Sequence, residues 1–179
     1  MPTSLKVPYL SQIDNELNPH GSCNVTSIGM CLAFLGFRGD RSYPQFEDQL
    51  YQKCEDNHWD RHSPGDLKQL AESFDSVEDD LTTTGTLDDI RAAIDAGKPC
   101  VVHGYFTRSG HIVVIRGYDD QGFIANDPYG EWFSWGYDIR ASGDGIHYSN
   151  ELIASVCSPE SVKSPKHIWL HRISRRKAL

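Results

Sequence analysis

Cys23 is the residue of this chain best suited to nucleophilic chemistry. It follows the turn-forming residues NPHGS (18–22) and begins an apolar helical pattern that ends at Gly36. The unsatisfied N–H groups in the first turn of a helix carry a partial positive charge, which favours a thiolate over a thiol. Because a thiolate attacks carbonyl carbon, this placement predicts acyl chemistry at Cys23.

The other cysteines fit a structural role, since free cysteine is commonly buried as a small apolar residue. They lie in apolar runs or near the ends of predicted helices: Cys31, Cys54, Cys100 and Cys157. The total of five is odd and includes no CxxC pair. We therefore expect free thiols, with no zinc site, no disulfide framework and no cofactor.

His111 is the best-placed general base among eight histidines. It follows Ser-Gly at the start of the apolar run HIVVIRGY, where a rigid strand can hold an imidazole at the mouth of a cleft. The others lie in turns, polar stretches or strand interiors: His20, His58, His62, His103, His147, His167 and His171. A surface or structural role is the alternative for any of the eight.

The block NDPYGE (126–131) offers two side chains that could orient this base. Pro128 cannot continue a strand ladder, so the chain should turn there and free the carboxylate of Asp127. Asn126 is an alternative, because Cys-His-Asn arrangements also exist. Successive strand residues face opposite sides, so only one of the two can face the imidazole. A plain Asn-Asp-Pro turn is a further alternative.

Gln12 is the candidate oxyanion donor. It ends the extended segment VPYLSQ (7–12), eleven residues before Cys23. Its side-chain amide, together with the backbone N–H of Cys23, could bind the oxyanion of a tetrahedral intermediate. A structural role in the loop is the alternative.

Length, charge and composition narrow the class of protein. The chain has 179 residues, enough for one domain over residues 1–179. Its net charge of −8 argues against nucleic acid as a partner. Residues 1–10 lack the apolar core of a secretory signal, and no run is long enough to insert into a membrane. The basic tail HRISRRKAL (171–179) is expected to be a solvated end, with a docking patch for an anionic surface as the alternative.

The order of the predicted elements indicates an α+β fold, with N-terminal helices packed on an antiparallel sheet. Helical patterns cover the Cys23 segment and three further stretches: 45–54, 63–74 and 86–97. The pattern then changes to β-branched and aromatic runs that predict strands at 100–106, 111–118, 122–127 and 166–173, with a short helix at 148–157.

These residues and their order resemble the papain-like cysteine peptidases, in particular the group similar to bacteriocin-leader (double-glycine) peptidases. The resembling segments are VPYLSQ (7–12), GSCNVTSIGMCLAFLG (21–36), GHIVVIRGYD (110–119) and NDP (126–128). The resemblance implies a papain-like fold. It also implies four roles: nucleophile for Cys23, base for His111, orienting carboxylate for Asp127 and oxyanion donor for Gln12.

One departure from this family lies at the nucleophile. The family commonly has Cys-Gly-Pro where this chain has Cys23-Asn24-Val25. Asn and Val change the start of the helix and leave less room beside the thiol, so the departure bears on substrate specificity more than on the chemistry.

The expected function is a thiol peptidase that works through an acyl-enzyme. The absence of a signal and of a membrane segment favours a lytic enzyme that cuts bacterial cell-wall (peptidoglycan) peptides, such as a phage endolysin made in the cytoplasm and released by a holin. Three alternatives remain open. The chain could cleave polypeptides, transfer an acyl group to an amine, or bind a ligand without catalysis on the aromatic block YGEWFSWGY (129–137). The cleaved bond, the host and the oligomeric state are left open.

Overall fold

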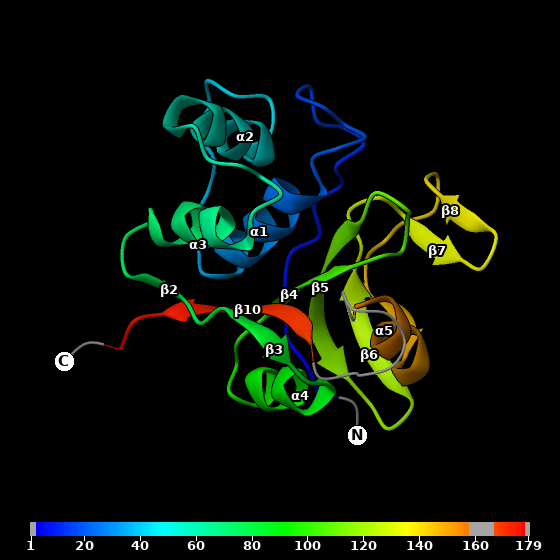
Figure 1. Ribbon diagram of the computed structural model, residues 1–179. Helices are drawn as coiled ribbons and strands as arrows, with labels where there is room; N and C mark the ends of the chain where they lie inside the picture. The colour runs from blue at the N-terminus through cyan, green and yellow to red at the C-terminus, as the bar shows by residue number, and fades with distance from the viewer. Residues whose placement is uncertain (1–2, 158–166, 178–179) are drawn as a thin grey trace.

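An antiparallel β-sheet with helices on both faces forms the centre of the molecule (Figure 1). The computed structural model describes residues 3–157 and 167–177. The helices are α1 (Cys23–Phe34), α2 (Phe46–Asn57), α3 (Pro64–Glu72), α4 (Leu87–Asp95) and α5 (Asn150–Val156). The strands are β1 (Thr3–Ser4), β2 (Val77–Asp79), β3 (Thr82–Gly85), β4 (Cys100–Gly104), β5 (His111–Tyr118), β6 (Gly122–Asn126), β7 (Glu131–Phe133), β8 (Gly136–Asp138), β9 (Ile146–Ser149) and β10 (Ile168–Arg175).

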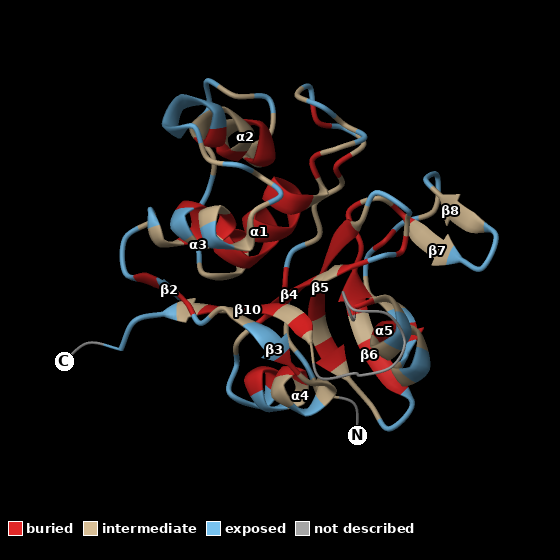
Figure 2. Ribbon diagram, in the orientation of Figure 1, coloured by how far each residue is buried: buried red, intermediate tan, exposed pale blue. Residues whose placement is uncertain are grey.

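Helices α1, α2 and α3 cover one face of the sheet. Helix α1 is the central helix of this layer, and every residue from Asn24 to Ala33 is buried. Its apolar side chains pack against Val101 of β4 and Val114 of β5, while α2 and α3 cover its outer side. Figure 2 shows the result: α1 is coloured as buried almost throughout, whereas α2 is exposed on its outer side. The start of α1 is therefore held rigidly against the sheet.

Helices α4 and α5 cover the opposite face of the sheet. Thr86 begins α4 with a capping box, in which Thr86 and Asp89 satisfy each other's backbone N–H groups. Ile90 and Ile94 of α4 then join a second core with Ile153 of α5. Because side chains alternate between the two faces along a strand, successive residues within β4, and within β5, contribute to different cores.

The strand order β2-β10-β4-β5-β6-β9 places β4, β5 and β6 side by side, with β1 added to β5 and β3 to β10. In the β4–β5 pair, Gly104 lies opposite His111. In the β5–β6 pair, the register shifts between Ile115 and Gly117, so that Val114 lies opposite Asn126. The shift is a bulge at Arg116, and it changes which residues of β6 share a face with His111.

The structure confirms the α+β fold class and most of the predicted elements. No element was predicted for β1 or for the four strands at residues 77–85, 131–133 and 136–138. β9 was missed as well, and its residues Tyr148 and Ser149 are strand residues rather than the start of the helix predicted at 148–157. The last predicted strand extends to Arg175, so the basic tail is part of the sheet up to that residue and is not simply a solvated end. Residue 166 of that prediction and residues 178–179 of the tail lie outside the described residues. Among the described helices, none is long and apolar enough to cross a membrane.

Candidate active site

Cys23 is the first residue of α1 and is half-buried, as its predicted place at a helix start requires. The preceding residue, Ser22, makes no capping hydrogen bond with its side chain, and its Oγ accepts a hydrogen bond from Asn15 Nδ2 over 2.8 Å. The same Nδ2 group donates to Thr26 Oγ1 over 3.0 Å. Asn15 therefore fixes the loop before Cys23 to the first turn of α1.

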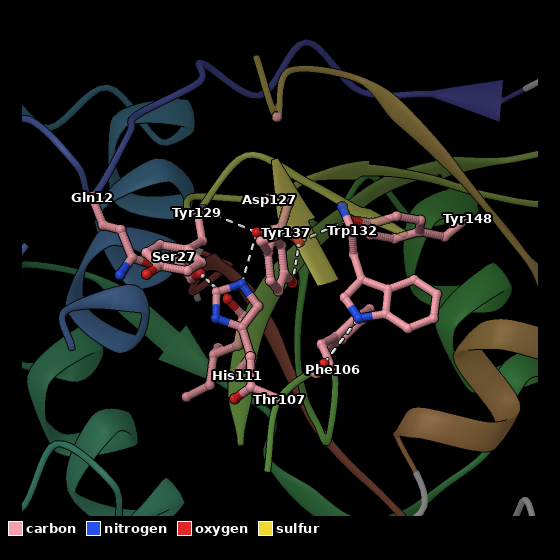
Figure 3. Close-up of polar contacts among 12 residues, drawn as sticks. Gln12, Ser27, Phe106, Thr107, His111, Asp127, Tyr129, Trp132, Tyr137 and Tyr148 are labelled. Atoms are coloured by element: carbon pink, nitrogen blue, oxygen red, sulfur yellow. Dashed lines mark hydrogen bonds and ion pairs between the residues drawn. The ribbon is translucent and has the colours of Figure 1, made fainter. Parts of the chain in front are cut away.

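His111 and Asp127 form a buried pair beside Cys23. Nε2 of His111 donates to Oδ1 of Asp127 over 2.7 Å, and the exposed fractions of the two residues are 6% and 0% (Figure 3). Because Nε2 is occupied, Nδ1 is the ring nitrogen left for Cys23, whose thiol interacts with the imidazole. The structure thus brings together the three residues that the sequence predicted for nucleophile, base and orienting group.

The carboxylate controls the charge of the imidazole. Burial alone would lower the pKa of His111, but the charge and hydrogen bond of Asp127 outweigh it, and Cys23 adds a smaller contribution in the same direction. The net effect raises the pKa of His111 from 6.5 to about 10. The His111 ring is therefore an imidazolium at neutral pH.

Two tyrosines that the sequence did not single out for this role also hold Asp127. The hydroxyl groups of Tyr137 in β8 and Tyr148 in β9 each donate to Oδ2 over 2.8 Å. The backbone N–H of Tyr129 donates to Oδ1 over 3.0 Å. Burial, and then the charge of Asp127, raise the pKa of both Tyr137 and Tyr148, so their phenols remain protonated donors. Both carboxylate oxygens are therefore satisfied without a second cation.

Asn126 faces away from the imidazole. Its Oδ1 accepts from Arg116 Nε over 2.8 Å and from the N–H of Gly145 over 3.1 Å, and its Nδ2 donates to the carbonyl of Val7 over 3.1 Å. Asn126 thus ties β6 to β5 and to the N-terminal segment. Of the two candidates for the orienting residue, only Asp127 contacts His111.

Gln12 is 1% exposed and lines the same cleft as Cys23. Its Nε2 donates to the carbonyl of Pro19 over 2.9 Å, which uses one of the two amide hydrogens. Its backbone N–H donates to the carbonyl of Pro128 over 2.9 Å, so the Gln12 loop is fixed to the turn that follows Asp127. No other hydrogen bond of Nε2 and none of Oε1 is formed with the described residues.

The cleft between these elements has a volume of about 370 Å³. Its walls come from the loop before α1, from the ends of β4 and β5, and from β10: Gln12, Cys23, His103, His111, Tyr129 and Trp169. No cluster of side chains in the described part of the chain is arranged to hold a metal ion.

The remaining cysteines differ from Cys23 in their surroundings. All four are buried: Cys31, Cys54, Cys100 and Cys157. Burial raises the pKa of Cys54 to about 11 and that of Cys157 to about 12, and it raises the pKa of the other two as well. Their thiols stay protonated at neutral pH, as expected of core residues.

The aromatic block at residues 129–137 has several roles rather than one. Tyr137 contacts Asp127, and Trp132 donates from Nε1 to the carbonyl of Phe106 over 2.9 Å. Trp135 is 71% exposed and stacks on Phe133. The block thus contributes Tyr137 to the surroundings of the His111–Asp127 pair, while its tip is exposed. The aromatic spacing signalled an important segment but not which ring reached the carboxylate.

The comparisons with known proteins concern the family and the fold. The sequence model of the Peptidase C39-like family matches residues 4–150. A crystal structure from Bacillus anthracis, described as a C39-like peptidase, is similar over 99% of this chain and 100% of that chain, with a TM-score of 0.64 and 17% sequence identity. At that identity the likeness concerns the fold. No curated protein matches the sequence.

Proposed function

The chain belongs to the Peptidase C39-like family and is a cysteine peptidase, and on that premise we propose that Cys23, His111 and Asp127 are its catalytic triad. The observation that carries the proposal is the buried hydrogen bond between His111 and Asp127 beside a cysteine at the start of a helix. This arrangement supplies a nucleophile, a base and an orienting carboxylate, which together suffice for acyl transfer.

The first half of the proposed reaction forms an acyl-enzyme. The Cys23 thiolate attacks the carbonyl carbon of the substrate, and the resulting oxyanion accepts hydrogen bonds from Gln12 Nε2 and the backbone N–H of Cys23. His111 then gives its Nδ1 proton to the leaving amine as the C–N bond breaks. Asp127 keeps the ring oriented throughout, because it holds the proton on Nε2.

The second half regenerates the enzyme. Nδ1 of His111 removes a proton from water, the hydroxide attacks the thioester, and the C–S bond breaks to release the carboxylic acid. The Cys23 thiolate and the His111 imidazolium are thereby restored. An amine in place of water would give acyl transfer by the same route, which is the second candidate reaction.

The substrate we propose is the peptide part of bacterial peptidoglycan, as in a phage endolysin that a holin releases from the cell. Support comes from the small cleft, which suits a short peptide stem, and from the lack of a membrane-spanning helix among the described residues. Polypeptides are the competing substrate class, because the same triad would cleave an ordinary peptide bond.

The test is hydrolysis of two substrates by the purified protein. Purified peptidoglycan and denatured casein are each incubated with the wild type, with Cys23→Ala and with the matched control Cys157→Ala, which removes a buried thiol on the other side of the sheet. Mass spectrometry should detect new amino termini released from peptidoglycan by the wild type and by Cys157→Ala, but not by Cys23→Ala. Release from casein alone would move the substrate to polypeptides. Incorporation of added glycine amide into the products would favour the transferase.

A further inference from the structure

A second buried histidine–aspartate pair lies beside the cleft, and the proposed reaction does not use it. Nδ1 of His171 in β10 donates to Oδ2 of Asp79 in β2 over 2.6 Å, and both side chains are 0% exposed. The other ring nitrogen of His171, Nε2, lies 2.9 Å from Nε2 of His103 in β4. The three residues form one hydrogen-bonded chain, Asp79–His171–His103.

The hydrogen-bonded chain Asp79–His171–His103 ends in the cleft at His103. This residue is half-buried and lines the same cleft as Cys23. The next residue of β4, Gly104, lies opposite His111 in the sheet register. The ring of Trp169 packs edge-on against that of His103, with 5.7 Å between the ring centroids. His103 is therefore held by neighbours on β10 at a position next to the proposed catalytic base.

Asp79 holds the buried end of this hydrogen-bonded chain. Its Oδ2 accepts the hydrogen bond from Nδ1 of His171, and no residue in the described part of the chain donates to its Oδ1. Lys68 of α3 donates to the backbone carbonyl of Asp79, and Glu72 accepts from its backbone N–H. The ring of His171 is therefore fixed in orientation by β2, which α3 holds in place.

His103 presents one free ring nitrogen. Burial, and then the electrostatic interaction with His171, lower the pKa of His103 to about 3, so its ring is neutral. Its Nε2 is occupied by the contact with Nε2 of His171. Nδ1 is therefore the ring nitrogen left to contact a ligand.

A metal centre does not explain this group. Asp79 and His103 contact opposite nitrogens of His171, so the three side chains share no common point at which an ion could be bound. No metal-binding cluster occurs elsewhere among residues 3–157 and 167–177.

We propose that His103 is a substrate-binding residue, whose Nδ1, held in place through His171 and Asp79, forms a hydrogen bond with the backbone of the bound peptide. The proposal rests on the proposed function for the identity of the ligand as a peptide. It assigns to the β4–β10 side of the cleft a specificity contact separate from Cys23, His111 and Gln12. Peptides that offer no hydrogen-bonding partner to Nδ1 of His103 would bind less tightly.

Two amide substitutions separate binding from structural support. An Asn amide nitrogen can replace Nδ1 of an imidazole, whereas a Gln amide nitrogen can replace Nε2. His103→Asn thus keeps a donor toward the cleft, while His103→Gln keeps a partner for His171. On the cleaved peptide, resynthesised with a fluorescent reporter, His103→Gln should raise KM about tenfold with little change in kcat, the size of one lost hydrogen bond.

His103→Asn should keep KM near the wild-type value and should unfold at a lower urea concentration, because it leaves His171 without its partner. An unchanged KM in His103→Gln would overturn the proposal, and so would a raised KM confined to His103→Asn. Either result would leave the hydrogen-bonded chain Asp79–His171–His103 with a structural role only.

The contact between His103 and a peptide can be measured without turnover. In Cys23→Ala protein with ¹⁵N-labelled imidazoles, soluble peptide fragments of peptidoglycan and a tryptic casein digest are added separately at pH 7. At least one of the two should shift the Nδ1 signal of His103, with His103→Asn providing the assignment. No shift with either would refute the proposal. A shift in a protein whose wild type hydrolyses neither substrate would refute the proposed function and leave this inference standing.

Discussion

Tyr137 donates its phenol hydrogen to Oδ2 of Asp127 over 2.8 Å and thereby joins the β7–β8 hairpin to the carboxylate that holds His111. The rings of Tyr137 and His111 also pack edge to face, with 5.2 Å between their centroids. One side chain thus contacts both members of the buried pair. The hairpin is expected to position the base as well as to cover it.

Tyr137→Phe should lower kcat by about tenfold while leaving KM nearly unchanged, because a hydrogen bond to a charged acceptor contributes about 1.4 kcal/mol or more. With one donor removed, the carboxylate should interact more strongly with His111 and raise its pKa further. The alkaline limb of the pH–rate profile should then move to higher pH. A loss of rate with an unmoved profile would point to a folding defect. Phe133→Leu, in the same hairpin and away from Asp127, is the control.

Cys23 should be alkylated far faster than the other four thiols by iodoacetamide at pH 6. The reason is the difference in surroundings, since Cys23 is half-buried beside an imidazolium and burial raises the pKa of each of the others. Peptide mapping by mass spectrometry measures the label at each site. Uniform labelling, or earlier labelling of a different cysteine, would contradict the assignment of the nucleophile.

Asp127→Ala should reduce kcat by about 10⁴-fold, as expected when the group that fixes the tautomer of a catalytic histidine is lost. Asn126→Ala should keep most of the activity per folded molecule, because Asn126 contacts Arg116, Gly145 and Val7 rather than His111. Its loss should instead lower the free energy of unfolding by about 1–3 kcal/mol. Active-site titration combined with urea unfolding distinguishes the two effects, and the reverse ranking of the two rates would overturn the assignment.

Gln12→Ala should lower kcat by about 10²–10³-fold with little change in KM, because an oxyanion donor acts on the transition state. The rate of Cys23 alkylation should stay at the wild-type value, since the thiolate does not depend on Gln12. Full retention of kcat would mean that backbone N–H groups alone hold the oxyanion. A variant that fails to fold would show that the hydrogen bond to Pro19 is structural.

The His111–Asp127 pair should make stability depend on pH in the alkaline range. The pKa of His111 in the folded protein is raised from 6.5 to about 10, so the folded state holds this proton more tightly than the unfolded state. The stabilisation is complete below about pH 6.5 and is lost as the pH rises to about 10. Urea unfolding of wild type and His111→Gln should show a stability difference that falls over this window. A difference that grows with pH would contradict the imidazolium form.

Much of the site was predictable because its signals are local. The turn before Cys23 and the apolar period after it indicate a helix start, and Ser-Gly before His111 indicates the start of a strand. A short-range pattern of this kind is set by backbone preference and by which face is buried. Helix and strand boundaries near the site therefore agreed with the structure to within a few residues.

The choice between Asn126 and Asp127 depended on strand register, which no local pattern encodes. In an antiparallel pair, residues directly opposite share a face. Near the turn, Gly117 lies opposite Ile124, but beyond the bulge at Arg116 the pairing changes to Val114 opposite Asn126. Without that bulge, the register would place Asn126 rather than Asp127 on the face of His111.

The sequence alone indicated Cys23, His111 and the Asn126–Asp127 pair, because each lies at the end of a regular element. The contacts of these and other polar residues appear only in the folded protein, where Tyr137 and Tyr148 donate to Asp127, and where Asp79, His171 and His103 form one hydrogen-bonded chain. These contacts join strands far apart in sequence, and their partners are set by sheet order and side-chain packing. A tyrosine in an aromatic run and a histidine inside a strand have the same local pattern whether they meet a carboxylate or another apolar residue.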